Sequence, residues 1–163
     1  MRAGLETHLG SHKVARIVYG SIIGLAFVVA LQDHPPRPAV LAIGLLLTGL
    51  AVALAEIYSE VVGVETAERH RVTGAQVAEM AGNGGAVAFG AAFPAVFFLL
   101  AAIDVLELAT AFTVAKVSGL GLIGFYAYWA ARFAGNPVPR ALAQAVIMAS
   151  VGAVVIALKA LLH

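Results

Sequence analysis

Long apolar blocks separated by short polar segments dominate the pattern of residues along this chain. Each block is close to the length, about 20 residues, that an α-helix needs to cross the hydrocarbon core of a bilayer. The pattern predicts five spans, over residues 14–31, 39–62, 86–103, 113–131 and 141–158. The predicted fold is therefore all-α, a polytopic membrane helix bundle, with residues 1–163 forming a single membrane domain.

Prolines and polar residues mark the predicted connections. QDHPPRP at 32–38 ends the first block because adjacent prolines cannot continue a helix, and GNPVPR at 135–140 forms the turn before the last block. Residues 65–83 are the most polar stretch, and we expect a cytoplasmic connection there, in which GNGG at 82–85 leads flexibly into the third span. Pro94 lies inside that span and predicts a kink.

Small residues recur at helix-packing spacing within the spans. Gly20 precedes Gly24 by four residues, and Gly90 has the same spacing to Ala86 and to Pro94. Such spacing lets two helix backbones approach closely in a membrane, so we expect these positions to lie at helix contacts.

The orientation follows from the basic residues, which favour the cytoplasmic side of membrane proteins. An N-terminus in the cytoplasm and a C-terminus outside give seven basic residues inside and three outside. The inside group is Arg2, Lys13, Arg16, Arg69, Arg71, Arg132 and Arg140, and the outside group is Arg37, Lys116 and Lys159.

Composition removes several classes of function. The chain is 61% hydrophobic and 12% charged, its net charge is +1, and its scattered basic residues form no surface for nucleic acid. Without cysteine it has no disulfide or thiolate ligand. No nucleophile elbow or hydrolytic carboxylate pair predicts an enzyme, and we expect no tightly bound cofactor. The polar first dozen residues, with no small-residue cleavage site after the first block, predict no removable signal peptide.

Two carboxylates near the predicted cytoplasmic end of the second span are the main candidates for chemistry. Glu56 and Glu60 lie one helical turn apart on one face, where they repel each other unless a cation or a shared proton lies between them. One interpretation is a cation site. The other is that both lie in the headgroup region, solvated or paired with Arg16, Arg69 or Arg71.

The polar stretch that follows adds further metal-ligand candidates, namely Glu65, Glu68, Glu79 and Met80. Carboxylate oxygens suit hard and borderline divalent cations, and a methionine thioether adds a softer ligand. Glu56, Glu60 and these four residues therefore make up the predicted metal site.

Three segments together resemble the vacuolar iron transporter family. LAVALAEIYSEVV at 50–62 is similar to a small-residue-rich stretch that ends in the family's Gly-Glu-Tyr-x-Ser, and it places Glu56 at the family's glutamate. FGAAFP at 89–94 resembles the third-span pattern of the family, and residues 124–158 resemble its last two spans. The resemblance implies a five-span homodimer that exports iron(II) or manganese(II) from the cytosol against protons.

The chain also departs from that family at positions tied to transport. Tyr19 precedes Gly20 where the family has an Asp-Gly pair, and Val52 lies near the family's second-span methionine. Many members carry a long Glu-rich cytoplasmic domain between their second and third spans. On this resemblance, a reduced version of that domain would consist of Glu60, Glu65, Glu68 and Glu79.

The leading hypothesis is a homodimeric, multi-pass carrier of iron(II) or manganese(II) in the plasma membrane of a prokaryote, with the lipid bilayer and the divalent cation as its other partners. Two alternatives stay open. The scaffold could serve a divergent transporter or channel for another small solute, or a non-transporting membrane subunit that binds a partner protein.

Overall fold

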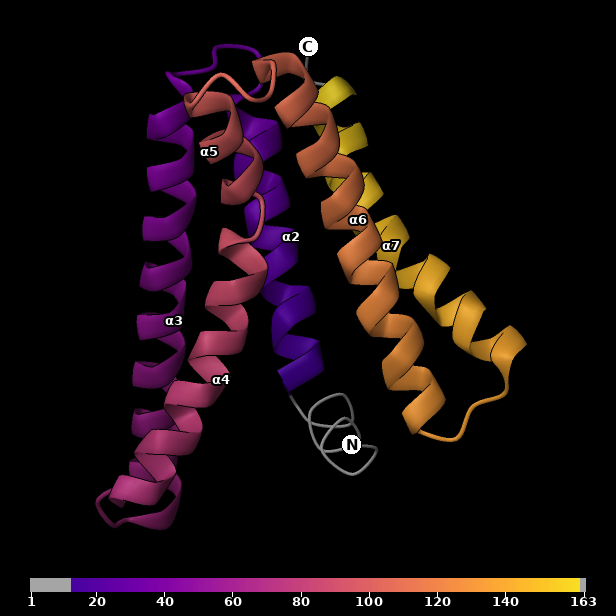
Figure 1. Cartoon of the computed structure of the whole chain (residues 1–163). Coiled ribbons are helices and arrows are strands. Elements are labelled where there is room, and N and C mark those ends of the chain that lie inside the picture. Colours follow the sequence, from indigo (N-terminus) through magenta and orange to yellow (C-terminus); the bar gives the residue numbers. More distant parts are fainter. Residues whose placement is uncertain (1–12, 162–163) are drawn as a thin grey trace.

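The computed structural model describes residues 13–161, and all the regular structure in this range is α-helical (Figure 1). The helices are α2 (Lys13–Leu31), α3 (Pro38–Glu68), α4 (Gly74–Ala92), α5 (Ala95–Ala102), α6 (Leu108–Phe133) and α7 (Val138–Leu161). The predictions for residues 1–12, including the absence of a signal peptide, lie outside the described residues.

The helices agree with the predicted spans in kind. Four helices are long and apolar enough to cross a membrane, and α4 and α5 pass the same test as a pair that is bent by 49°, which gives up to five spans. The fold is therefore the all-α membrane bundle that the hydropathy pattern predicts. The start of α2, the α3–α4 connection and the α6–α7 connection lie at one end (Figure 1), which we call the inner end because the charge count predicts it to be cytoplasmic.

Helix α2 forms the centre of the bundle. Within its most apolar stretch 44% of the residues are buried, against 28% in α3 and 12% in α7. It contacts α4 on one side and the α6–α7 pair on the other, while α3 packs mainly on α4 and α5. The first span therefore lies between α4 and the α6–α7 pair.

The outer half of the bundle has a well-packed apolar core. Leu41 and Leu45 of α3 meet Phe98 of α5 and Phe112 of α6 there, and all four side chains are buried. The two aromatic rings lie edge to face with centroids 4.9 Å apart, an arrangement that aromatic pairs prefer. This core joins α3, α5 and α6 at the end away from the charged residues of the inner end.

The bend between α4 and α5 confirms the kink predicted at Pro94. Helix α4 ends at Ala92 and α5 begins at Ala95, so the break falls on Phe93 and Pro94. Proline has no backbone N–H to donate and its ring clashes with the preceding turn, which is why the span bends at this position.

The polar stretch over residues 65–83 differs from the predicted connection. Helix α3 continues to Glu68 and α4 already begins at Gly74, so only residues 69–73 connect them. With 31 residues at 1.5 Å each, α3 is roughly 46 Å long and extends beyond a hydrocarbon core of about 30 Å. A capping box starts α4, since the Gln76 N–H donates to Thr73 Oγ1 (3.4 Å) and the Thr73 N–H donates to Gln76 Oε1 (2.8 Å).

The GNGG segment is therefore part of α4 rather than a flexible lead. One of its glycines serves helix packing: a Cβ on Gly84 would lie 3.0 Å from the Ala53 carbonyl oxygen of α3, whereas a Cβ on Gly85 would meet nothing within 4 Å. Glycine lowers intrinsic helix propensity, and here tertiary contacts override that preference.

Helices α2 and α4 approach so closely that only glycine fits at their contact. A Cβ would lie 2.1 Å from the Val87 carbonyl oxygen if added to Gly20, and 2.4 Å from the Ala91 carbonyl oxygen if added to Gly24. From the other side, a Cβ on Gly90 would lie 2.2 Å from the carbonyl oxygen of Ile17. The predicted packing role of these three glycines is confirmed.

The contrast between two glycines of α4 gives a test of this packing. Gly90→Ala should destabilise the protein by about 1–3 kcal/mol, because the added methyl forces two backbones apart. The matched variant Gly85→Ala should be neutral or stabilising by up to about 1 kcal/mol, because it adds helix propensity in open space. Unfolding in mixed detergent micelles measures both, and equal stability of the two variants would contradict the packing described.

Candidate functional site

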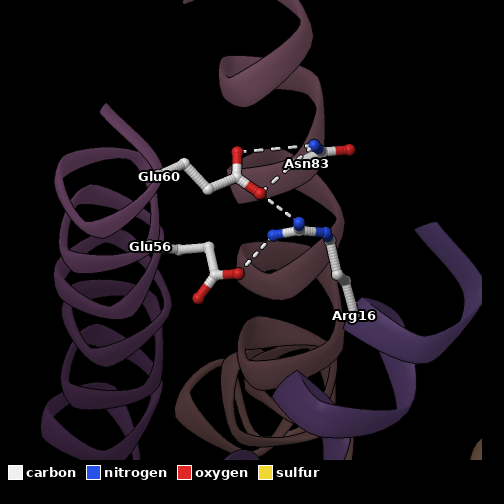
Figure 2. Close-up of polar contacts among 4 residues, drawn as sticks. All are labelled: Arg16, Glu56, Glu60 and Asn83. Atoms are coloured by element: carbon white, nitrogen blue, oxygen red, sulfur yellow. Dashed lines mark hydrogen bonds and ion pairs between the residues drawn. The ribbon is translucent and has the colours of Figure 1, made fainter. Parts of the chain in front are cut away.

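Three helices bring charged and polar side chains together at the inner end (Figure 2). Arg16 comes from the first turn of α2, Glu56 and Glu60 come from α3, and Asn83 comes from α4. The glycine contact between α2 and α4 fixes the position of Arg16 along the bundle axis relative to Asn83. The packing of α3 on α4 places the two carboxylates beside them.

The guanidinium of Arg16 bridges the two carboxylates. One terminal nitrogen donates to Glu56 Oε1 and the other donates to Glu60 Oε1. The side chains of Arg16, Glu56 and Glu60 are 21%, 30% and 21% exposed. The planar fork of arginine suits such a bridge, since it presents donors to two acceptors at once. The predicted alternative in which Arg16 pairs with both carboxylates is therefore the arrangement found.

Asn83 adds a second contact to one of these carboxylates. Its side-chain nitrogen donates to both oxygens of Glu60, at 3.4 Å each. Glu60 therefore connects α3 to α2 through Arg16 and to α4 through Asn83. With one positive and two negative charges, the group keeps a formal charge of −1.

Glu60 and Asn83 also line a cavity of about 360 Å³ between α3 and α4. Its other lining residues are Gly63, Val64, Glu79 and Met80. Met80 is buried, with 5% of its surface exposed. The cavity thus gathers three of the predicted metal ligands, Glu60, Glu79 and Met80, around one space.

The other predicted ligands lie apart from this cavity. Glu56 is paired with Arg16 one turn further into the membrane, while Glu65 and Glu68 are exposed near the end of α3. Within residues 13–161, no three acidic or histidine side chains are close enough together to hold a metal ion. The donor set of the cavity is instead mixed, with two carboxylates, an amide and a thioether.

Asn83 is the member of the site that sequence reasoning missed. Arg16 is among the three basic residues predicted as partners of the carboxylates, whereas Asn83 falls in the segment predicted to be a flexible lead into the third span. Once residues 74–92 are known to be helical, Asn83 lies four residues after Glu79 and three after Met80, on the same face of α4. That spacing is the signal that could have found it.

His70 lies in the α3–α4 connection, outside the membrane spans. Its Nδ1–H donates to the Arg71 carbonyl oxygen (2.9 Å), and its Nε2 lies 2.6 Å from Glu68 Oε2. The hydrogen bond to the Arg71 carbonyl is the main cause that raises the pKa of His70. Desolvation opposes it by lowering the pKa, and the nearby carboxylates of Glu68 and Glu65 add to the rise. The protonated form is thereby favoured in the folded chain, and this preference is lost as the pH rises through the raised pKa.

Glu68→Gln should therefore lower the pKa of His70 only in part, because the Arg71 carbonyl remains as its acceptor. An NMR titration of the histidine ring in detergent micelles measures the change. An unchanged pKa would show that the Glu68 carboxylate does not act on His70.

The bridge itself predicts a stability difference between two glutamates of α3. Glu60→Gln should destabilise the protein, because Arg16 then keeps only one charged partner. Losing an exposed ion pair costs roughly 0.2–1 kcal/mol and breaking a buried one roughly 3–5 kcal/mol, and we expect a loss between these two ranges. Glu65→Gln changes an exposed residue of the same helix and should have little effect. Detergent unfolding compares the two, and a Glu60→Gln variant as stable as Glu65→Gln would argue against the bridge.

Comparisons with protein-family models, with curated proteins and with solved structures find no significant match for this chain.

Proposed function

We propose that this chain is a multi-pass membrane carrier of divalent cations, with iron(II) or manganese(II) as its substrate. The observation that carries the proposal is the cavity at the inner end, where Glu60 of α3 meets Glu79, Met80 and Asn83 of α4. Carboxylate and amide oxygens are ligands of hard and borderline cations, and a buried thioether favours a transition metal over magnesium or calcium.

The placement of the cavity supports a role as an entrance. It lies at the end where the basic residues predict the cytoplasm, and the formal charge of the Arg16 bridge is −1, which attracts cations toward it. The resemblance to the vacuolar iron transporters adds the remaining parts of the proposal. These are export from the cytosol in exchange for protons, assembly as a homodimer, and a location in the plasma membrane of a prokaryote.

A specific feature favours a second candidate, a carrier of another small solute on the same scaffold. Tyr19 stands where the resembled family has an acidic residue, and half of its surface is exposed on α2. A phenol neither holds a divalent cation nor carries a proton as a carboxylate does at neutral pH.

Flux into proteoliposomes tests the proposal. The purified protein should transport manganese(II) and iron(II) in preference to magnesium(II) and calcium(II), and a pH gradient should change the rate. Glu60→Gln should lower the flux by about tenfold or more, since it removes a ligand charge from the cavity. The control is Glu107→Gln, an exposed acidic residue at the opposite end, which should transport at the wild-type rate.

Two results would contradict this assignment in different ways. Equal flux in wild type and Glu60→Gln would remove the cavity from the transport path. Absence of flux for every metal, with a well-folded protein, would overturn metal transport itself and leave the second candidate or a non-transporting subunit.

A further inference from the structure

The guanidinium of Arg16 occupies the position that a cation would take between two carboxylates. Glu56 Oε1 and Glu60 Oε1 each accept a hydrogen bond from a different terminal nitrogen of Arg16 (Figure 2). All three side chains are at least 70% buried, so water screens these charges only partly. The repulsion expected between two carboxylates one turn apart is thereby removed without a bound ion or a proton.

Glu60 belongs to this bridge and to the neighbouring cavity at the same time. It faces Arg16 with one oxygen and Asn83 with both, and it lines the cavity together with Glu79 and Met80. A divalent cation that binds both oxygens of Glu60 must therefore displace the donors that now occupy them. Asn83 can adapt by rotating its side-chain amide. The amide oxygen then faces the cation, where the amide nitrogen now faces Glu60.

We propose that Arg16 is a resident counter-ion that competes with the substrate cation for Glu60 and so keeps the affinity of the cavity low. This inference rests on the proposed function, because it requires that the cavity receive a divalent cation. Weak binding has a use in a transport path, since an ion that binds too tightly is not released. Arg16 is on this account a selectivity residue: only a cation of higher charge density than a guanidinium displaces it.

Removing the arginine separates this role from a purely structural one. Manganese(II) chloride is titrated into the purified full-length protein in detergent, and binding is followed by the EPR signal of free manganese(II). Arg16→Gln should bind manganese(II) about tenfold more tightly than wild type, a coupling typical of competing ligands. The matched control Arg71→Gln removes an exposed positive charge at the same end and should change the affinity by no more than about twofold, since water and salt screen it.

Two further measurements identify where the gained affinity comes from. The double variant Arg16→Gln with Glu60→Gln should lose the gain, because the competed carboxylate is gone. Thermal unfolding gives a second readout: Arg16→Gln should unfold at a lower temperature in EDTA, since Glu56 and Glu60 then repel each other, and manganese(II) should stabilise it more than wild type.

A folded Arg16→Gln variant that binds manganese(II) no more tightly than wild type, or only as much more tightly as Arg71→Gln, would overturn the inference. If Arg16→Gln does not fold, Arg16→Lys replaces it, since one ammonium cannot bridge both carboxylates as the fork does. An intermediate gain in affinity would then support competition, and an unchanged affinity would refute it. Metal flux in wild-type proteoliposomes tests the proposed function separately. If wild type transports manganese(II) but Arg16→Gln binds it no more tightly, only this inference is rejected. If Arg16→Gln binds manganese(II) more tightly but wild type transports no metal, only the carrier function is rejected.

Discussion

The close contact between α2 and α4 is the constraint on which the rest of the structure depends. Helices in a bilayer gain little from hydrophobic burial against each other, because lipid tails are as apolar as the side chains, so their association relies on close packing. In this chain Gly20, Gly24 and Gly90 let two backbones meet where even a methyl group would overlap a carbonyl oxygen. Because α2 is also the helix that α6 and α7 pack against, the position of this contact determines how both halves of the bundle are arranged.

The same contact explains why charged residues meet at the inner end. Arg16 lies one turn before Gly20 on α2, and Asn83 lies two turns before Gly90 on α4, so fixing the glycines fixes these two side chains on neighbouring helices. Helix α3 then packs on α4 through Gly84, which brings Glu56 and Glu60 within reach of Arg16. The polar group is thus a consequence of apolar packing, and the ion pairs stabilise an arrangement that the glycines have already set.

Much of the fold follows from the sequence because hydropathy and proline placement are local signals. The apolar blocks predicted the spans, and Pro94 predicted the bend, since each effect acts within a turn or two of the residue concerned. The secondary structure of the polar residues 65–83 is harder to predict, because polarity indicates that a segment is exposed to water but does not indicate whether it is helical. Outside the bilayer a long helix can be fully polar, and the capping of α4 by Thr73 and Gln76 depends on side-chain hydrogen bonds that compositional reasoning overlooks.

The site divides in the same way between local and long-range information. Glu56 and Glu60 share a face by the helical period alone, but nothing near them decides among Arg16, Arg69 and Arg71 as their partner. The structure selects Arg16, which lies 40 residues before Glu56. The pairing also changes what the carboxylates can do. Two free acids would carry a charge of −2 and bind a divalent ion strongly, whereas the bridged group carries −1 and offers Glu60 only in competition with Arg16. On the proposed function, the chemistry of this entrance is therefore set by a basic residue, and the acidic residues that the sequence reveals first describe only half of it.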